Sequence, residues 1–173
     1  MLKLGVTLGR ESTEKAAIEK RTCTAINYVS NFSRSTDGWS EEQGIATFTP
    51  AVTVGGLFPV LQLDFEAPRP GATGGATILK ILDKALSAGC SYSYSLQYYI
   101  PAGNVNITSL KNISIGGKVL TIDNSPVPTG TWLTRSGNFI ADADNVVKLQ
   151  FNTLDAAGAD SAYLYDIRIF SNF

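Results

Sequence analysis

The chain has 173 residues, of which 44% are hydrophobic and only 17% are charged. The apolar fraction and the net charge of −1 exclude a disordered chain, and 14 basic against 15 acidic residues give no electrostatic drive toward nucleic acid. No apolar run approaches the ~20 residues that span a bilayer. Histidine is absent, which excludes an imidazole base and zinc sites built on histidine. We therefore expect one soluble domain without a cofactor, whose partner is neither nucleic acid nor membrane.

The first 23 residues differ in composition from the rest of the chain. Positions 2, 4, 6 and 8 are apolar, and this alternation predicts a short strand that has no partner within its own segment. Residues 10–21 then contain seven charged side chains, so this segment cannot hold itself against a core. We predict that residues 1–23 form an arm that docks on a neighbouring chain by strand addition, and that residues 24–173 form the domain. An arm that packs on its own domain is the alternative.

The two cysteines, Cys23 and Cys90, lie far apart in the sequence and in different contexts. We expect two unpaired thiols that pack as small hydrophobic side chains, with a disulfide as the alternative. The first ten residues contain only a short, broken apolar stretch, so we do not expect a secretory signal.

From residue 25 onward, short segments with strand patterns alternate with turns. Residues 77–82 suit either a helix or a strand, and Gly116-Gly117 predicts a hairpin turn. The other expected strands cover residues 45–49, 57–65, 91–99, 105–115, 118–122, 132–141, 146–151 and 163–170. This pattern predicts an all-β protein, a jelly-roll β-sandwich of about 8–10 antiparallel strands with a short N-terminal arm.

Two of these strands have clear outward faces. In residues 61–66 the apolar side chains alternate with an outward polar row of Gln62, Asp64 and Glu66. In residues 91–99 three tyrosines and a leucine face the core, and Gln97 and Tyr99 lie on the opposite face beside two serines. If both strands belong to one sheet, these rows form a polar trough with an aromatic ring at its end, which suits a sugar. The alternative is an ordinary solvated sheet face.

Several short motifs follow one another along the chain in a recognisable order. They are Asn31-Phe32, Gly38-Trp39 and residues 86–89, 92–96, 130–132, 139–141, 147–151 and 163–167. This order resembles the jelly-roll carbohydrate-binding modules of families 4, 9 and 22, within the wider galactose-binding-domain-like fold. The resemblance covers residues 25–173. Such modules also occur fused to enzymes, in surface proteins and as decorations on bacteriophage virions.

The resemblance implies a sugar site made of aromatic platforms and polar groups on one sheet or at its loop edge. The candidate carbohydrate-binding residues are Tyr99, Gln97, Gln62, Asp64, Glu66 and Trp39. We assign Trp132 a structural role, which is also the alternative for Trp39.

Many modules of this type bind a structural calcium ion through acidic residues after the first Asn-Phe pair and near the last strand. Here these positions hold Ser33 and Tyr165-Asp166. Asp166 alone cannot supply the about 6–8 oxygen ligands that calcium takes, so we expect no metal.

An enzyme is a remote alternative. Jelly-roll glucanases use a Glu-x-Asp-x-Glu strand, and residues 62–66 match its spacing. The first position is the amide Gln62, which cannot ionise or attack an anomeric carbon, so we expect no enzymatic activity.

The sequence thus predicts a structural or adhesion component of a virus (phage) particle, docked by residues 1–23 on other virion subunits in a homo- or hetero-oligomer. Its sandwich would display a site for a cell-surface glycan. The alternative is a free or enzyme-associated carbohydrate-binding module with an extracellular location.

Overall fold

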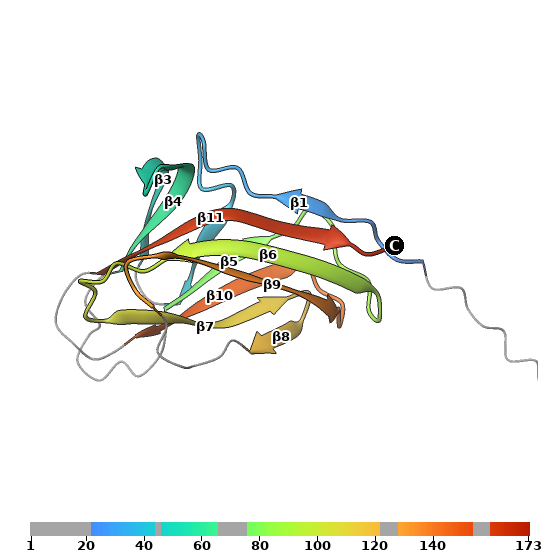
Figure 1. Cartoon of the computed structure of the whole chain (residues 1–173). Coiled ribbons are helices and arrows are strands. Elements are labelled where there is room, and N and C mark those ends of the chain that lie inside the picture. The colour runs from blue at the N-terminus through green and yellow to red at the C-terminus, as the bar shows by residue number, and fades with distance from the viewer. Residues whose placement is uncertain (1–21, 44–45, 66–75, 122–127, 154–159) are drawn as a thin grey trace, which may run out of the picture.

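The computed structural model describes residues 22–43, 46–65, 76–121, 128–153 and 160–173. Within these ranges eleven strands form two antiparallel sheets that lie one above the other (Figure 1). The first sheet has the order β3 (Ala46–Val54), β4 (Leu57–Phe65), β11 (Asp160–Ser171), β6 (Ser91–Tyr99) and β9 (Trp132–Ile140), and β1 (Asn27–Val29) also pairs with β11. The second has the order β2 (Trp39–Gln43), β5 (Ala76–Ile81), β10 (Val146–Thr153), β7 (Ile107–Ile115) and β8 (Lys118–Thr121).

This arrangement confirms the predicted all-β jelly-roll sandwich. None of the described residues is helical, and the ambiguous residues 77–82 contribute to strand β5. No helix of this described part is long and apolar enough to cross a membrane.

The core lies between the two sheets and follows the predicted alternation. In β4 the side chains of Leu61, Leu63 and Phe65 are buried, and the rings of Phe65 and Phe151 join the sheets with centroids 5.4 Å apart. Tyr92 and Leu96 of β6, Leu149 of β10 and Ile167 of β11 are also buried, and Tyr94 packs partly buried against this core. Burial of each such side chain contributes about 1.5–3 kcal/mol, so this alternation dictates which face of each strand turns inward.

The expectation of two free thiols is wrong. Cys23 and Cys90 form a disulfide, with their Cα atoms 5.9 Å apart and a sequence separation of 67. The backbone next to Cys23 is also bound to the sandwich, because Thr24 donates from its N–H to Ser87 Oγ at 3.0 Å and accepts from the Tyr92 hydroxyl at 3.1 Å. The pairing depends on which distant segments lie side by side, and the local context of each cysteine does not contain that information.

Residues 1–21, which make up most of the predicted arm, lie outside the described residues, so the arm stays a prediction. Its last residue, Cys23, is covalently joined to the start of β6 through Cys90. Any docking role of the arm therefore starts from a fixed point on the sandwich.

The disulfide should contribute substantially to stability, because it closes a long loop in the unfolded chain. We expect the double variant Cys23→Ser/Cys90→Ser to lose about 2–4 kcal/mol of unfolding free energy, measured by denaturant titration. Dithiothreitol should lower the unfolding midpoint of the wild type and leave that of the double variant unchanged. Equal wild-type midpoints with and without reductant would contradict the prediction.

Candidate functional site

A row of side chains crosses four strands on the outer face of the first sheet. The register places Gln62 of β4 opposite Tyr163 of β11, Tyr163 opposite Tyr99 of β6, and Tyr99 opposite Trp132 of β9. Directly opposite residues share one face of a sheet, with Cβ atoms about 4.5–5.5 Å apart. We call these four residues the outer row. At ~4.8 Å between neighbouring strands the outer row extends over about 14 Å.

The aromatic members of the outer row contact one another. The ring centroids of Tyr99 and Trp132 are 5.6 Å apart, and those of Tyr99 and Tyr163 are 5.8 Å apart. Tyr165 adds a further ring beside Trp132, at 6.1 Å. All four rings are half-buried and meet at tilted or perpendicular angles, as aromatic pairs prefer. The result is a continuous aromatic surface that is partly open to solvent.

A polar cluster adjoins this aromatic surface at the β4 side. The amide Nε2 of Gln62 donates to Asp64 Oδ1 at 2.8 Å, and Ser161 Oγ donates to the same oxygen at 2.6 Å. An ionised carboxylate offers about four lone-pair positions, so Asp64 retains capacity to accept a further hydrogen bond. The Gln62 carbonyl oxygen adds a second acceptor. Rings beside fixed hydrogen-bonding groups can bind a ligand that has both apolar faces and hydroxyl groups.

Most of the predicted site residues lie on this one face. Strands β4 and β6 belong to the same sheet with β11 between them, so Gln62, Asp64, Gln97 and Tyr99 share its outer face. Gln97 lies opposite Tyr165 and continues the polar surface away from the outer row. Glu66 falls outside the described residues.

Trp39 is not on this face, and its place among the candidate sugar contacts is a correction. It belongs to β2 of the second sheet and is only 2% exposed. Its ring packs in the core, and its Nε1 donates to the Tyr28 hydroxyl at 3.1 Å. A residue with both its ring and its polar atom engaged inside the protein cannot offer a platform to a sugar.

Three aromatic residues of the face were missed from the sequence. Tyr163 and Tyr165 flank the buried Leu164, so the period-2 alternation already places both tyrosines outward. Trp132 received a structural role, although its register partner Tyr99 was a candidate. The alternation could have identified the orientation, whereas the identity of the neighbouring strands required the fold.

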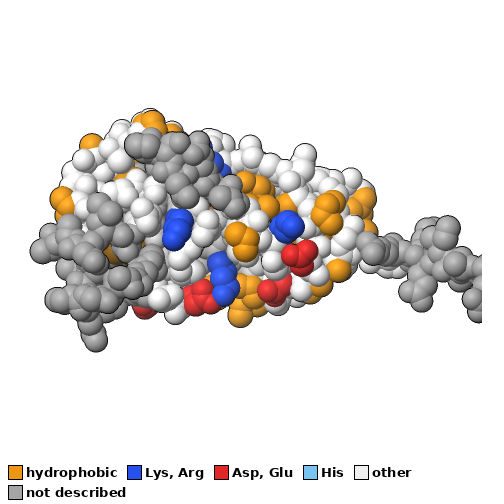
Figure 2. Space-filling view, turned by 90° about the horizontal axis from the view of Figure 1, so that it is seen from below, with side chains coloured by type: hydrophobic (Ala, Val, Ile, Leu, Met, Phe, Trp, Pro, Cys, Tyr) orange, Lys and Arg blue, Asp and Glu red, His pale blue; other side chains and the backbone are white. Residues whose placement is uncertain are grey.

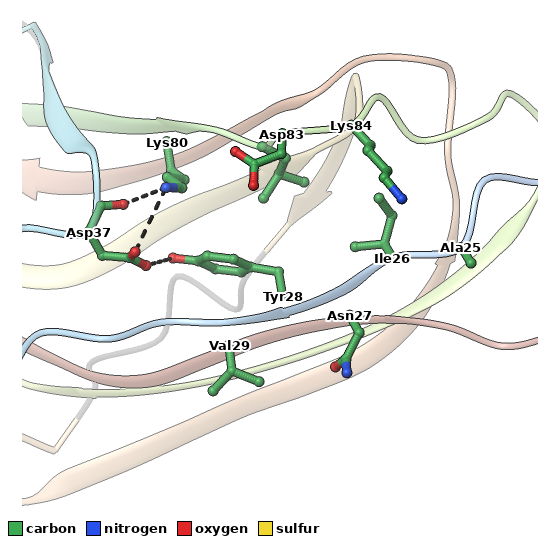
Figure 3. A pocket seen from close by; sticks show the side chains of 10 residues that line it. Ala25, Ile26, Asn27, Tyr28, Val29, Asp37, Lys80, Asp83 and Lys84 are labelled. Carbon is green, nitrogen blue, oxygen red and sulfur yellow. Dashed lines mark hydrogen bonds and ion pairs between the residues drawn. The ribbon is translucent and has the colours of Figure 1, made fainter.

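A second feature is a cavity of about 450 Å³ between β1 and the segment that follows β5 (Figure 3). In Figure 3 the Tyr28 ring points toward Asp37, and its hydroxyl donates to Asp37 Oδ2 at 2.6 Å. Lys80 Nζ donates to the Asp37 carbonyl oxygen at 2.5 Å and lies 5.5 Å from the Tyr28 ring centroid. Burial, together with the hydrogen bond to Asp37, raises the pKa of Tyr28 above its ordinary value. These groups satisfy one another, so the network holds the turn at Asp37 in place.

The positions that resembled calcium ligands have other partners. Ser33 Oγ donates to Asn31 Oδ1 at 2.7 Å, and Arg168 Nε donates to Asp166 Oδ1 at 2.6 Å. Across the described ranges no group of three His, Cys, Asp or Glu side chains is arranged to hold a metal ion.

The outer face of the second sheet has a different character (Figure 2). Its groove of about 280 Å³ contains Lys148 ion-paired with Glu42, and Asn112 Nδ2 donating to Gln150 Oε1 at 2.8 Å. Figure 2 shows charges of both signs among hydrophobic and uncharged side chains on this side. The aromatic residues in the five strands of this sheet, Trp39 and Phe151, are both buried. Of the two sheets, the first is therefore the one whose described strands carry a partly exposed aromatic surface.

Comparison with known proteins shows the class of fold. No protein-family model and no curated protein sequence matches the chain. Among solved structures, the CBM22-1 xylan-binding domain of Paenibacillus barcinonensis Xyn10C is similar, with a TM-score of 0.59, 14% identity and coverage of 87% of this chain and 97% of that chain. A family 4 carbohydrate-binding module is similar with a TM-score of 0.53, 19% identity and coverage of 82% and 100%.

A third structure, the CBM22-1-GH10 part of Clostridium thermocellum xylanase Xyn10B in complex with xylohexaose, has a TM-score of 0.51 and 16% identity. The match covers 79% of this chain and 26% of that chain. The chain thus has the jelly-roll fold of carbohydrate-binding modules.

The network around Asp37 yields a stability prediction. Tyr28→Phe removes a hydroxyl that both donates to Asp37 and accepts from Trp39, and it leaves two partly buried polar groups without this partner. We expect a loss of about 1–3 kcal/mol in unfolding free energy by denaturant titration. Tyr99→Phe removes a hydroxyl from the half-buried outer face and should change stability by less than about 0.5 kcal/mol. Equal effects of the two variants would refute this role of Tyr28.

Proposed function

We propose that this protein is a non-catalytic carbohydrate-binding protein that holds a glycan on the outer face of its first sheet. The observation that carries the proposal is the outer row, in which three aromatic rings from three neighbouring strands line up beside Gln62. The fold shared with carbohydrate-binding modules supports this function, because the similar structures include a xylan-binding domain.

The chemistry of the face suits a neutral glycan chain. The rings of Tyr99 and Tyr163 stack on the apolar faces of pyranose rings, and Asp64 accepts hydrogen bonds from hydroxyl groups. The outer row is long enough to contact more than one sugar ring. Because family 22 modules of similar fold include a xylan-binding domain and a complex with xylohexaose, xylohexaose is a suitable first probe.

The residues on the same face do not fit a glycoside hydrolase. A retaining glycosidase needs a carboxylate nucleophile paired with a carboxylic acid about 5–5.5 Å away. The position that matches the nucleophile by spacing is Gln62, whose amide donates to Asp64 and cannot attack a sugar. Binding without bond cleavage is the function that this arrangement supports.

We further propose that the sandwich is displayed on a virus (phage) particle, where residues 1–23 dock on other virion subunits and the outer row contacts a host surface glycan. Support comes from the alternating residues 2–8, which predict a strand that needs a partner. The Cys23–Cys90 disulfide fits a protein that works outside the cell, since disulfides persist on virion surfaces and in secreted proteins. The alternative is a free or enzyme-associated extracellular module.

Removal of the Tyr99 ring tests the glycan site. Tyr99→Ala should lose most of the affinity for xylohexaose in isothermal titration calorimetry, because stacking contributes ~1 kcal/mol or more beyond buried area. The matched control is Val119→Ala, which truncates an exposed side chain on the outer face of the second sheet and should bind as the wild type does. Absence of wild-type binding to xylohexaose and to a broad glycan array would reject the proposed function.

Deletion of the arm tests the proposed docking. A variant that lacks residues 1–21 keeps Cys23 and its disulfide, so its Tm should stay close to that of the full chain. We expect it to remain monomeric in gel filtration and to fail to join any assembly that the full chain forms. If the full chain is itself monomeric and does not attach to particles, the virion proposal is wrong. The extracellular module is then the better interpretation.

A further inference from the structure

The indole N–H of Trp132 is a buried donor that finds no hydrogen-bond partner among the residues that the structure describes. It lies on the outer row, where the ring also contacts Tyr99 and Tyr165. A buried donor without a partner is destabilising because it has lost its hydrogen bonds to water, so native proteins contain few such groups. Such a group at the edge of a candidate sugar site calls for a physical explanation.

Gly55 covers this N–H. A Cβ atom built on Gly55 would lie 3.0 Å from Trp132 Nε1 and 3.5 Å from Cδ1, so only glycine allows the backbone to approach so closely. Gly55 also has a φ of +59°, in the left-handed region that favours glycine. We call residues 54–57, between and at the ends of β3 and β4, the hairpin tip.

The hairpin tip reaches Trp132 across the sheet. Strands β3 and β4 lie at one side of the first sheet and β9 at the other, with β11 and β6 between them. In Figure 1 the hairpin stands at the end of the sandwich where β9 begins. Register shifts in β3 between Thr49 and Val52 and between Val52 and Val54 bend the hairpin, as β-bulges do. The contact with Gly55 therefore comes from a hairpin that arches over the outer face.

Val60 provides independent evidence for this arch. It alternates with the core residue Leu61 and so faces outward, yet it is fully buried and does not belong to the core between the sheets. A covered side chain on an outer face requires something above it. The base of the hairpin is fixed, because the N–H of Ala51 donates to the Phe32 carbonyl at 2.9 Å. Phe58, next to the tip, is 54% exposed and so provides little anchorage.

We infer that the hairpin tip is a strap that covers Trp132 in the ligand-free protein and lifts when a glycan enters, so that Trp132 becomes a sugar-binding residue. This inference rests on the proposed function of the outer row. A sugar hydroxyl then accepts the hydrogen bond that the indole N–H lacks, and the uncovered ring extends the aromatic surface at the β9 side. The strap consequently selects ligands that reach the end of the outer row.

The experiment compares two neighbouring glycines. Gly55→Ala places a methyl group against Trp132 and should favour the lifted state. Gly56→Ala is the matched control, because Gly56 also has a positive φ, +82°, but no atom of the described ranges lies within 4 Å of its Cβ position. Both variants introduce backbone strain in the same turn, and only the first disturbs the contact with Trp132.

Tryptophan fluorescence reports the strap directly. The second tryptophan, Trp39, is 2% exposed and should be shielded from iodide in every variant. Iodide should quench Trp132 more strongly in Gly55→Ala than in the wild type or Gly56→Ala. Because binding no longer has to lift the strap, Gly55→Ala should bind xylohexaose up to about tenfold more tightly than Gly56→Ala. Trp132→Phe should bind more weakly than the wild type.

The possible outcomes distinguish a failure of the strap inference from a failure of the proposed glycan-binding function. If xylohexaose binds with equal affinity to both glycine variants and iodide quenching is the same in both, the hairpin tip does not act as a strap, and the proposed function stands. If xylohexaose binds to the wild type and Trp132→Phe retains full affinity, Trp132 is not a sugar contact and the inference is overturned. If no form of the protein binds a glycan, the proposed function fails and the inference fails with it.

Discussion

The candidate site depends on the pairing of β11 with β4 on one side and β6 on the other. These two strands are separated by 25 residues of sequence (66–90) and do not pair with each other. The backbone hydrogen bonds of β11 bring Gln62 and Tyr99 to either side of Tyr163, and the same register buries Leu164 beneath them. A slip of one residue would turn Tyr163 toward the core and Leu164 toward solvent, so the hydrophobic core itself fixes the geometry of the outer face.

The two outer faces of the sandwich differ in the polar groups and aromatic rings that a ligand could contact. On the second sheet, Lys148 and Glu42 neutralise each other and the amides of Asn112 and Gln150 are paired, so these four polar side chains are engaged with one another. On the first sheet, aromatic rings occupy successive positions across the strands and Asp64 keeps unused acceptor capacity. Of the two faces, as far as their residues are described, the first sheet is the one that combines partly exposed rings with a free acceptor, which is why we propose recognition there.

The local sequence pattern correctly predicted most of the strands, the side chains that face the core and the class of fold. The alternation of Leu61, Leu63 and Phe65 identified the core face of β4, and the order of motifs indicated the jelly roll. Features that depend on contacts between distant segments could not be predicted from this local pattern. The disulfide joins segments 67 positions apart, the burial of Trp39 depends on its place between the sheets, and the position of Trp132 beside Tyr99 depends on β9 pairing with β6. Period-2 alternation gives the direction of a side chain but not the identity of its neighbours across the sheet.

The position of β11 in the chain has a consequence for biosynthesis. It is the last strand in sequence order, yet it is a central strand of the first sheet and also pairs with β1. A ribosome releases β4 and β6 well before β11, and until then each has an open edge that can pair with another nascent chain. The outer row therefore cannot assemble before β11 has been synthesised. Premature termination upstream of residue 160 would yield a product without this row, however well the second sheet had formed.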